Sequence, residues 1–135
     1  MALTADRNTP ARGGSGLSLA VAAATIIFAG SLVCRNAAGN AVPGSTSTTL
    51  KALGMASERV DNSAGLAGDD HVQIEKGVYR FGNSASTDLI TIADIGNDCY
   101  VVDDQTVAKT SGTNTRSIAG TVFDVDADGV WVQFA

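Results

Sequence analysis

Short apolar runs separated by turn-forming residues dominate the chain from Leu17 onward. Such runs are too short for long amphipathic helices and are typical of β-strands bounded by turns. The pattern predicts a mainly all-β domain. Strands are expected over Ser18–Ala22, Ile26–Arg35, Ala41–Pro43, Leu53–Val60, Val72–Phe81, Cys99–Asp103, Val107–Lys109, Ala119–Val125 and Val130–Phe134. Lys76-Gly77 interrupts one of them and predicts a bulge or a tight bend.

One short helical turn is expected at residues 91–96. The Thr91 side chain can accept a hydrogen bond from the first N–H groups of the turn, and the Asp94 side chain can accept one from the Thr91 N–H. Gly96 can adopt the left-handed conformation that ends the turn. A helix over Ala20–Ala29 is the main alternative to the strand assignment there, because alanine favours helices.

The composition gives a surface poor in charge. The chain is 44% hydrophobic, 5% aromatic and 17% charged, against roughly 25% charged residues in an average soluble domain. We therefore expect a partner to cover part of the surface. A net charge of −5 argues against sequence-independent binding of nucleic acid, which requires cations to neutralise phosphates.

The charge is unevenly distributed. Residues 1–60 hold five basic and two acidic residues, a sum of +3, whereas residues 61–135 hold four basic and twelve acidic residues, a sum of −8. This asymmetry would suit copies that meet head to tail, or a basic leading segment that reaches an acidic neighbour. Chance asymmetry in a small domain remains the alternative.

Residues 1–16 contain one strongly hydrophobic residue, Leu3, and end in a Gly/Ser-rich run. Such a segment buries too little apolar surface to order itself. The sequence therefore predicts an extended arm over residues 1–16, lying against a partner, and a β-rich domain over residues 17–135.

No charge occurs between Leu17 and Cys34, so a membrane span or a signal peptide must be considered. The stretch is diluted by small and polar residues, and Leu17, Leu19 and Val21 recur at the period of a strand. We therefore expect no membrane partner. An exported β-domain, with residues 1–29 as the signal, remains the alternative.

The two cysteines, Cys34 and Cys99, form neither a C-x-x-C motif nor a zinc-ligand spacing. A disulfide would fit an oxidising compartment, and two buried thiols would fit the cytoplasm. We expect free thiols.

Asp124, Asp126 and Asp128, followed by Gly129, match the opening of a calcium-binding loop. The twelfth position of that loop requires a glutamate and is Ala135 here, and strand-like sequence flanks the motif. A β-hairpin is the favoured interpretation, with the three aspartates a weak metal candidate. No cofactor is expected.

The sequence shows no convincing catalytic group. Asp103 and Asp104 are adjacent, so on a strand they would point to opposite faces, and a turn is favoured. His71 lacks a recognisable nucleophile and is expected in a surface loop. The 13–16 segment lacks the lysine of a phosphate loop. Trp131 is expected in the core. We expect no enzymatic activity.

Several segments, in this order, resemble the small capsid cement (head decoration) proteins of tailed phages and prophages. They are Leu53–Ala56, Val60–Asn62, Gly77–Phe81, Ile92–Gly96, Cys99–Val107, Ala119–Val122 and Val125–Val132, with Leu17–Ala23 similar to the first strand of that family. The resemblance covers about residues 17–134.

The resemblance implies a non-enzymatic virion protein with a small β-barrel or β-tulip-like domain. It implies binding to the major capsid protein on the outer surface of the capsid, typically as a homotrimer, after assembly in the host cytoplasm. We expect the arm to contact capsid protein by adding a strand to an exposed edge. Its candidate binding residues are Leu3, Arg7, Arg12, Gly13, Gly14 and Gly16.

Overall fold

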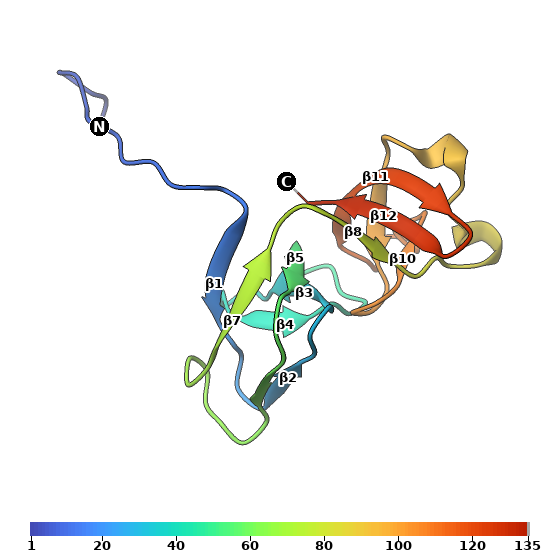
Figure 1. Ribbon diagram of the computed structural model, residues 1–135, viewed down its shortest axis with the longest axis horizontal. Coiled ribbons are helices and arrows are strands. Elements are labelled where there is room, and N and C mark those ends of the chain that lie inside the picture. The colour runs from blue at the N-terminus through green and yellow to red at the C-terminus, as the bar shows by residue number, and fades with distance from the viewer. Residues whose placement is uncertain (135) are drawn as a thin grey trace.

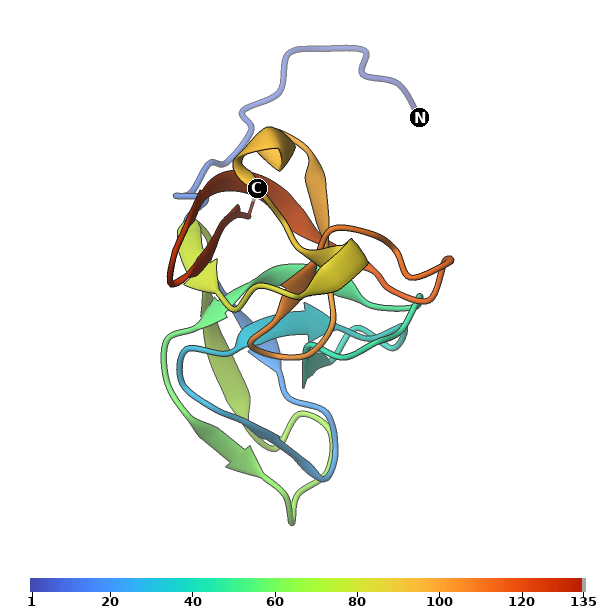
Figure 2. The same ribbon diagram turned by 90° about the vertical axis from the view of Figure 1, so that its right-hand side faces the viewer.

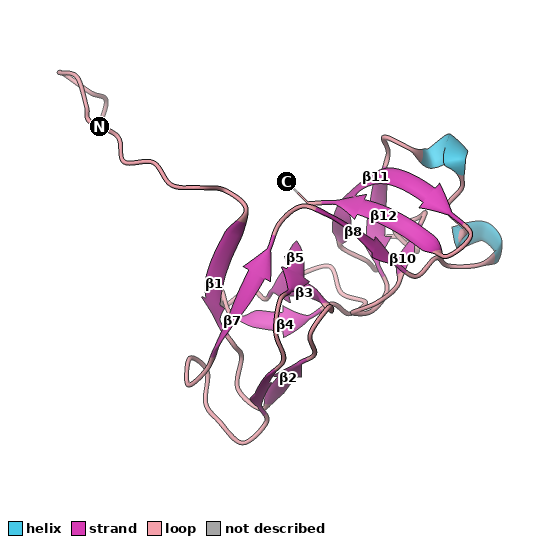
Figure 3. Ribbon diagram, in the orientation of Figure 1, coloured by secondary structure: helices cyan, strands magenta, loops and turns pink. Residues whose placement is uncertain are grey.

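The computed structural model describes residues 1–134 and confirms the all-β prediction (Figures 1 and 3). The strands are β1 (Gly16–Ala20), β2 (Thr25–Ile27), β3 (Leu32–Arg35), β4 (Ala41–Pro43), β5 (Lys51–Ala56), β6 (Val60–Asn62), β7 (His71–Glu75), β8 (Val78–Phe81), β9 (Asp98–Val101), β10 (Val107–Ala108), β11 (Ile118–Asp126) and β12 (Gly129–Gln133).

The strands form three antiparallel sheets. The first has the order β1-β7-β5-β3-β4, the second has the order β10-β9-β11-β12-β8, and β2 pairs with β6. The barrel expected from the family resemblance does not form, since the described strands do not close on themselves. Figure 1 shows the first and second sheets as the two halves of the body.

Three predicted strands are each divided in two. Ile26–Arg35 contains most of β2 and all of β3, Leu53–Val60 contains most of β5 and the start of β6, and Val72–Phe81 contains most of β7 and all of β8. Gly30, with φ of +82°, and Gly77, with φ of +152°, provide the turns inside two of these ranges. Both values lie in the region that glycine adopts without steric cost. The bend predicted at Gly77 is therefore confirmed.

Two clusters of buried side chains form the core, and β3 contributes to both. Leu32 and Cys34 pack in the cluster under the second sheet, whereas Val33 packs in the cluster of the first sheet. Alternate residues of a strand point to opposite faces, so a strand between two clusters must be apolar on both faces. This explains the uninterrupted Leu-Val-Cys sequence of β3.

Two 3-10 turns lie on the half of the body that holds the second sheet (Figure 3): η1 (Ser86–Asp88), which was not predicted, and η2 (Ile92–Asp94), which was. In η2 the Thr91 N–H donates to Oδ2 of Asp94 at 2.8 Å, and Gly96 has φ of +92°. The helix considered over residues 20–29 is not present, because β2 and a turn occupy that segment.

Candidate functional site

The first candidate is the predicted arm. Residues 1–15 form no strand, and all their side chains are exposed. Figure 1 shows this segment leaving the body at β1, and in Figure 2 its first residues again lie outside the outline of the strands. The Ser15 carbonyl accepts a hydrogen bond from the Lys76 N–H at 2.6 Å. Gly16 belongs to β1, so the arm ends one residue earlier than predicted.

The structure does not gather the predicted arm residues into one site. Leu3 is 71% exposed, and Arg7 donates to the Thr9 hydroxyl at 2.8 Å. Arg12 has no hydrogen bond or ion pair with any residue of the described chain, 1–134. Gly13 and Gly14 have open space where a Cβ would be. No close contact requires these glycines, which fits the flexible joint that their composition predicts.

The arm continues directly into a free sheet edge. Among the described strands, β1 pairs with β7 alone, from Gly16 opposite Glu75 to Ala20 opposite His71. The other side of β1 therefore presents backbone groups that can accept a further strand.

A second candidate, which the sequence did not reveal, is an exposed apolar surface on the half of the body that holds the second sheet. Ile92 is 70% exposed and Phe123 is 56% exposed, and Ile95 is also exposed. The Gly96 N–H donates to the Val122 carbonyl at 2.9 Å, which holds the η2 turn against β11 beside Phe123. We call Ile92, Ile95 and Phe123 the distal apolar surface, because the arm leaves the opposite half (Figure 1).

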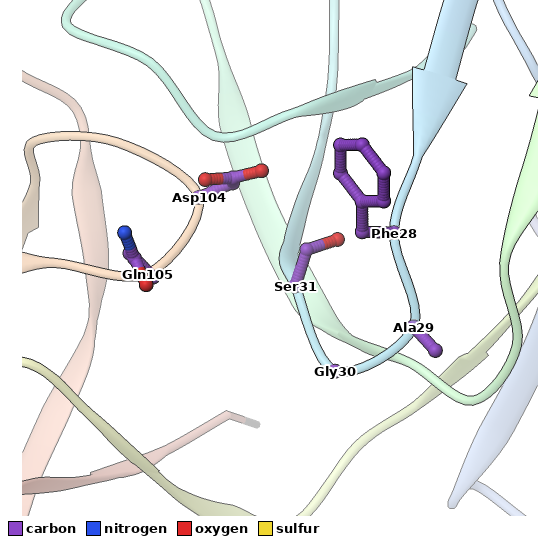
Figure 4. A pocket seen from close by; sticks show the side chains of 6 residues that line it. All are labelled: Phe28, Ala29, Gly30, Ser31, Asp104 and Gln105. Atoms are coloured by element: carbon purple, nitrogen blue, oxygen red, sulfur yellow. The ribbon is translucent and has the colours of Figure 1, made fainter.

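A third candidate is an open hollow of about 420 Å³ between the turn that joins β2 to β3 and the turn that joins β9 to β10 (Figure 4). Its lining residues are Phe28, Ala29, Gly30, Ser31, Asp104 and Gln105. The Leu32 N–H donates to the Asp104 carbonyl at 2.8 Å, and the Gly82 N–H donates to the Gln105 carbonyl at 2.7 Å. These bonds fix the β9–β10 turn relative to the first residue of β3 and to the residue that follows β8.

The hollow holds polar groups that lack partners. Ser31 is 6% exposed, and its buried hydroxyl has no hydrogen-bond partner. Leaving such a group unpaired costs about 1–3 kcal/mol. The half-buried Asp104 carboxylate likewise has no hydrogen bond or ion pair with residues 1–134. The Phe28 ring borders the hollow and has the Arg59 guanidinium 5.5 Å from its centroid.

The motif of Asp124, Asp126 and Asp128 lies in the β11–β12 hairpin, as the favoured interpretation expected, with Asp124 and Asp126 in β11 and Asp128 in the turn. Asp126 Oδ1 accepts from the N–H groups of Asp128 and Gly129, and its Oδ2 accepts from the Trp131 indole N–H at 2.8 Å. These bonds hold the pKa of Asp126 below its ordinary value, with the indole the largest cause. Asp124 Oδ1 accepts from the Val125 N–H.

No cluster of three or more metal-ligating side chains occurs among residues 1–134. The motif therefore gives no support for a metal site in the described chain, and Ala135, its twelfth position, lies outside the described residues.

Trp131 does not lie in the core, contrary to the prediction. Val130 and Val132 point inward and are fully buried, so Trp131 between them points to the opposite face. There it is half-buried, with the Arg80 guanidinium 5.7 Å from its ring. The aromatic ring is used to cover the hairpin rather than to fill the core.

The remaining polar candidates, Asp103 and His71, lie in different segments of the described chain. Asp103 Oδ1 accepts from the Gln105 N–H at 2.9 Å, which confirms the predicted turn. His71 is exposed as predicted, although it is the first residue of β7 rather than part of a loop.

Cys34 and Cys99 are free and buried. Burial raises the pKa of each thiol to about 12. Thiols of such high pKa are poor nucleophiles and poor metal ligands, so both behave as core residues.

No protein-family model, curated protein or solved structure matches this chain. Within residues 1–134, neither 3-10 turn has the length or the apolar character that a membrane-spanning helix needs.

Proposed function

We propose that this protein is a structural, non-enzymatic component of a phage virion that decorates the outer surface of the capsid. It bridges neighbouring major capsid subunits and contacts further copies of itself, as a homotrimer, after assembly in the host cytoplasm. The observation that carries the proposal is the exposed arm of residues 1–15, which leaves the body on the half opposite the distal apolar surface. The sequence resemblance to capsid cement proteins points the same way.

The arm supplies one attachment. It is extended, and it continues into the free edge of β1. A strand from capsid protein can pair with this edge, so that backbone hydrogen bonds provide affinity. Leu3 then supplies an apolar anchor and Arg7 a charge contact, with Gly13 and Gly14 allowing the arm to bend before Gly16 enters the sheet.

The distal apolar surface supplies a second attachment. Burying Ile92, Ile95 and Phe123 against a partner removes apolar area from water, at about 25 cal/mol per Å². Two attachments on one molecule make the second binding event intramolecular, so modest contacts add up. Subunits joined in this way separate only when both attachments are released.

The test is occupancy on purified phage heads that lack this protein. Full-length protein and a variant without residues 2–14 are each incubated with heads, pelleted, and quantified per capsid subunit. We expect the full-length protein to reach saturation and the shortened variant to lose at least about tenfold in affinity. Ile92→Ser combined with Phe123→Ser tests the distal apolar surface in the same assay.

Leu66→Ala is the matched control, because Leu66 is an exposed leucine outside both attachment regions. It should bind as the parent protein does. Absence of head binding by the full-length protein would reject the proposal, and a mature protein beginning after residue 29 would favour an exported domain. Binding that is unchanged without the arm would remove the arm from the mechanism.

A further inference from the structure

The hollow between the β2–β3 and β9–β10 turns is lined by one carboxylate, that of Asp104, which has no partner in the described chain. Figure 4 shows Asp104 and Gln105 on one side and the Phe28–Ser31 turn on the other. The Ser31 hydroxyl is buried and also unpaired. A group that complements the Asp104 carboxylate carries positive charge and donates hydrogen bonds.

A guanidinium meets both requirements. It is planar, always charged, and has five N–H donors. It also stacks on aromatic rings within about 6 Å of the centroid, and Phe28 already has one guanidinium, that of Arg59, at 5.5 Å. Asp104 is the acidic residue among those that line the hollow.

The chain itself carries a guanidinium available for this contact. Arg7 follows Asp6 and donates to Thr9, whereas Arg12 has neither a neighbouring acid nor a hydrogen bond within the described chain. Arg12 lies four positions before Gly16, the first residue of β1, a span of at most about 14 Å. The arm leads away from its own body (Figure 1), which places Arg12 where a second copy can meet it.

We infer that Arg12 of one copy binds in the hollow of a second copy, where its guanidinium pairs with the Asp104 carboxylate beside Phe28. Such a head-to-tail contact uses different surfaces on the two copies, and it closes into a ring when the rotation between copies allows. Residues 1–9 remain free for capsid protein. The inference rests on the self-association in the proposed function and is independent of capsid binding.

A charge exchange tests this contact on the full-length protein in solution. Sedimentation equilibrium is measured for the parent and for Arg12→Asp, Asp104→Arg and the double variant. We expect each single variant to weaken association about tenfold or more, and the double variant to recover most of the loss, because the pair is restored with reversed charges. The Asp104 side chain makes no hydrogen bond within residues 1–134, so the fold should persist, as circular dichroism would verify.

Mixing the two single variants distinguishes contact between copies from contact within one. The Arg12 arm of the Asp104→Arg protein can then enter the intact hollow of the Arg12→Asp protein. Association in the mixture above that of either variant alone supports the inference, and no gain on mixing overturns it. Lys51→Glu is the matched control, because Lys51 is exposed and lies outside the arm and the hollow, and a loss equal to that of Arg12→Asp would show a general charge effect and overturn the specific contact.

Amide NMR signals provide the local readout. Signals of Ser31 and Gln105 should shift with protein concentration in the parent and not in Arg12→Asp. A parent protein that stays monomeric at high concentration, or associates without shifting these signals, overturns the inference. Either result leaves head binding, and therefore capsid decoration, to be judged by its own assay.

Discussion

The Trp131 indole N–H donates to Oδ2 of Asp126 at 2.8 Å, while Oδ1 of the same carboxylate accepts the N–H groups of Asp128 and Gly129. One side chain therefore closes the β11–β12 turn and holds the aromatic ring over it. Asp126→Ala removes all three hydrogen bonds and should lower the melting temperature. Asp124→Ala is the control, because that carboxylate bonds only to the next N–H, and it should have a smaller effect. Equal effects would contradict the special role of Asp126.

Stability should fall in acid because hydrogen bonds lower the pKa of several carboxylates. The hydrogen bond that lowers each pKa most comes from the Ser63 hydroxyl for Asp61, the Thr110 side chain for Asp88, the Thr91 N–H for Asp94 and the Trp131 indole for Asp126. A folded-state pKa below the unfolded value gives stability that is fully present above the unfolded pKa and is lost as the pH falls through the folded pKa. The urea midpoint should therefore decrease below about pH 4. A midpoint unchanged down to about pH 3 would contradict this prediction.

Leu32 should be among the most sensitive core positions. It is fully buried in the cluster under the second sheet. Leu32→Ala should lower the free energy of unfolding by about 2–5 kcal/mol, through lost burial and the cavity left behind. Urea denaturation measures this value. Leu66→Ala removes the same atoms from a side chain that is 73% exposed and should change stability by less than about 0.5 kcal/mol.

The positions of the strands could be predicted because apolar alternation and turn residues act locally. The Gly77 bend and the β11–β12 hairpin were both found in this way. The sheet order could not be predicted, because it depends on contacts between distant residues. β7 and β8 are consecutive in the chain but belong to different sheets, and the apolar pattern of each strand does not specify which partner it pairs with.

The candidate sites were less predictable than the fold. The arm was visible as a segment with a single strongly hydrophobic residue, Leu3. The hollow was not, because Phe28 and Asp104 are distant in the sequence and are brought together by tertiary contacts such as the Leu32 N–H bond to the Asp104 carbonyl. The distal apolar surface left a weaker signal: the predicted η2 turn contains isoleucines at 92 and 95, and a single turn has too little surface to bury both.

Substitution of Gly129 should destabilise the protein for two separable reasons. Its φ of +154° disfavours a side chain, and a Cβ there would collide with the Phe81 carbonyl oxygen of the neighbouring strand. Gly68, with φ of +88° and open space around it, has the first constraint only. Gly68→Ala should destabilise the protein by about 1 kcal/mol and Gly129→Ala by about 3 kcal/mol or more. Similar values from urea denaturation would show that the collision is relieved.

The two thiols should react slowly in the folded protein and rapidly after unfolding. Cys34 and Cys99 are fully buried, and with pKa values raised to about 12 only about one thiol in ten thousand is ionised at pH 8. Ellman's reagent should label two thiols per chain in denaturant without reductant and far fewer in buffer. The slow native reaction should accelerate in Leu32→Ala, because attack requires opening of the cluster that contains both cysteines. Two thiols that react rapidly in the folded protein would contradict the packing of that cluster.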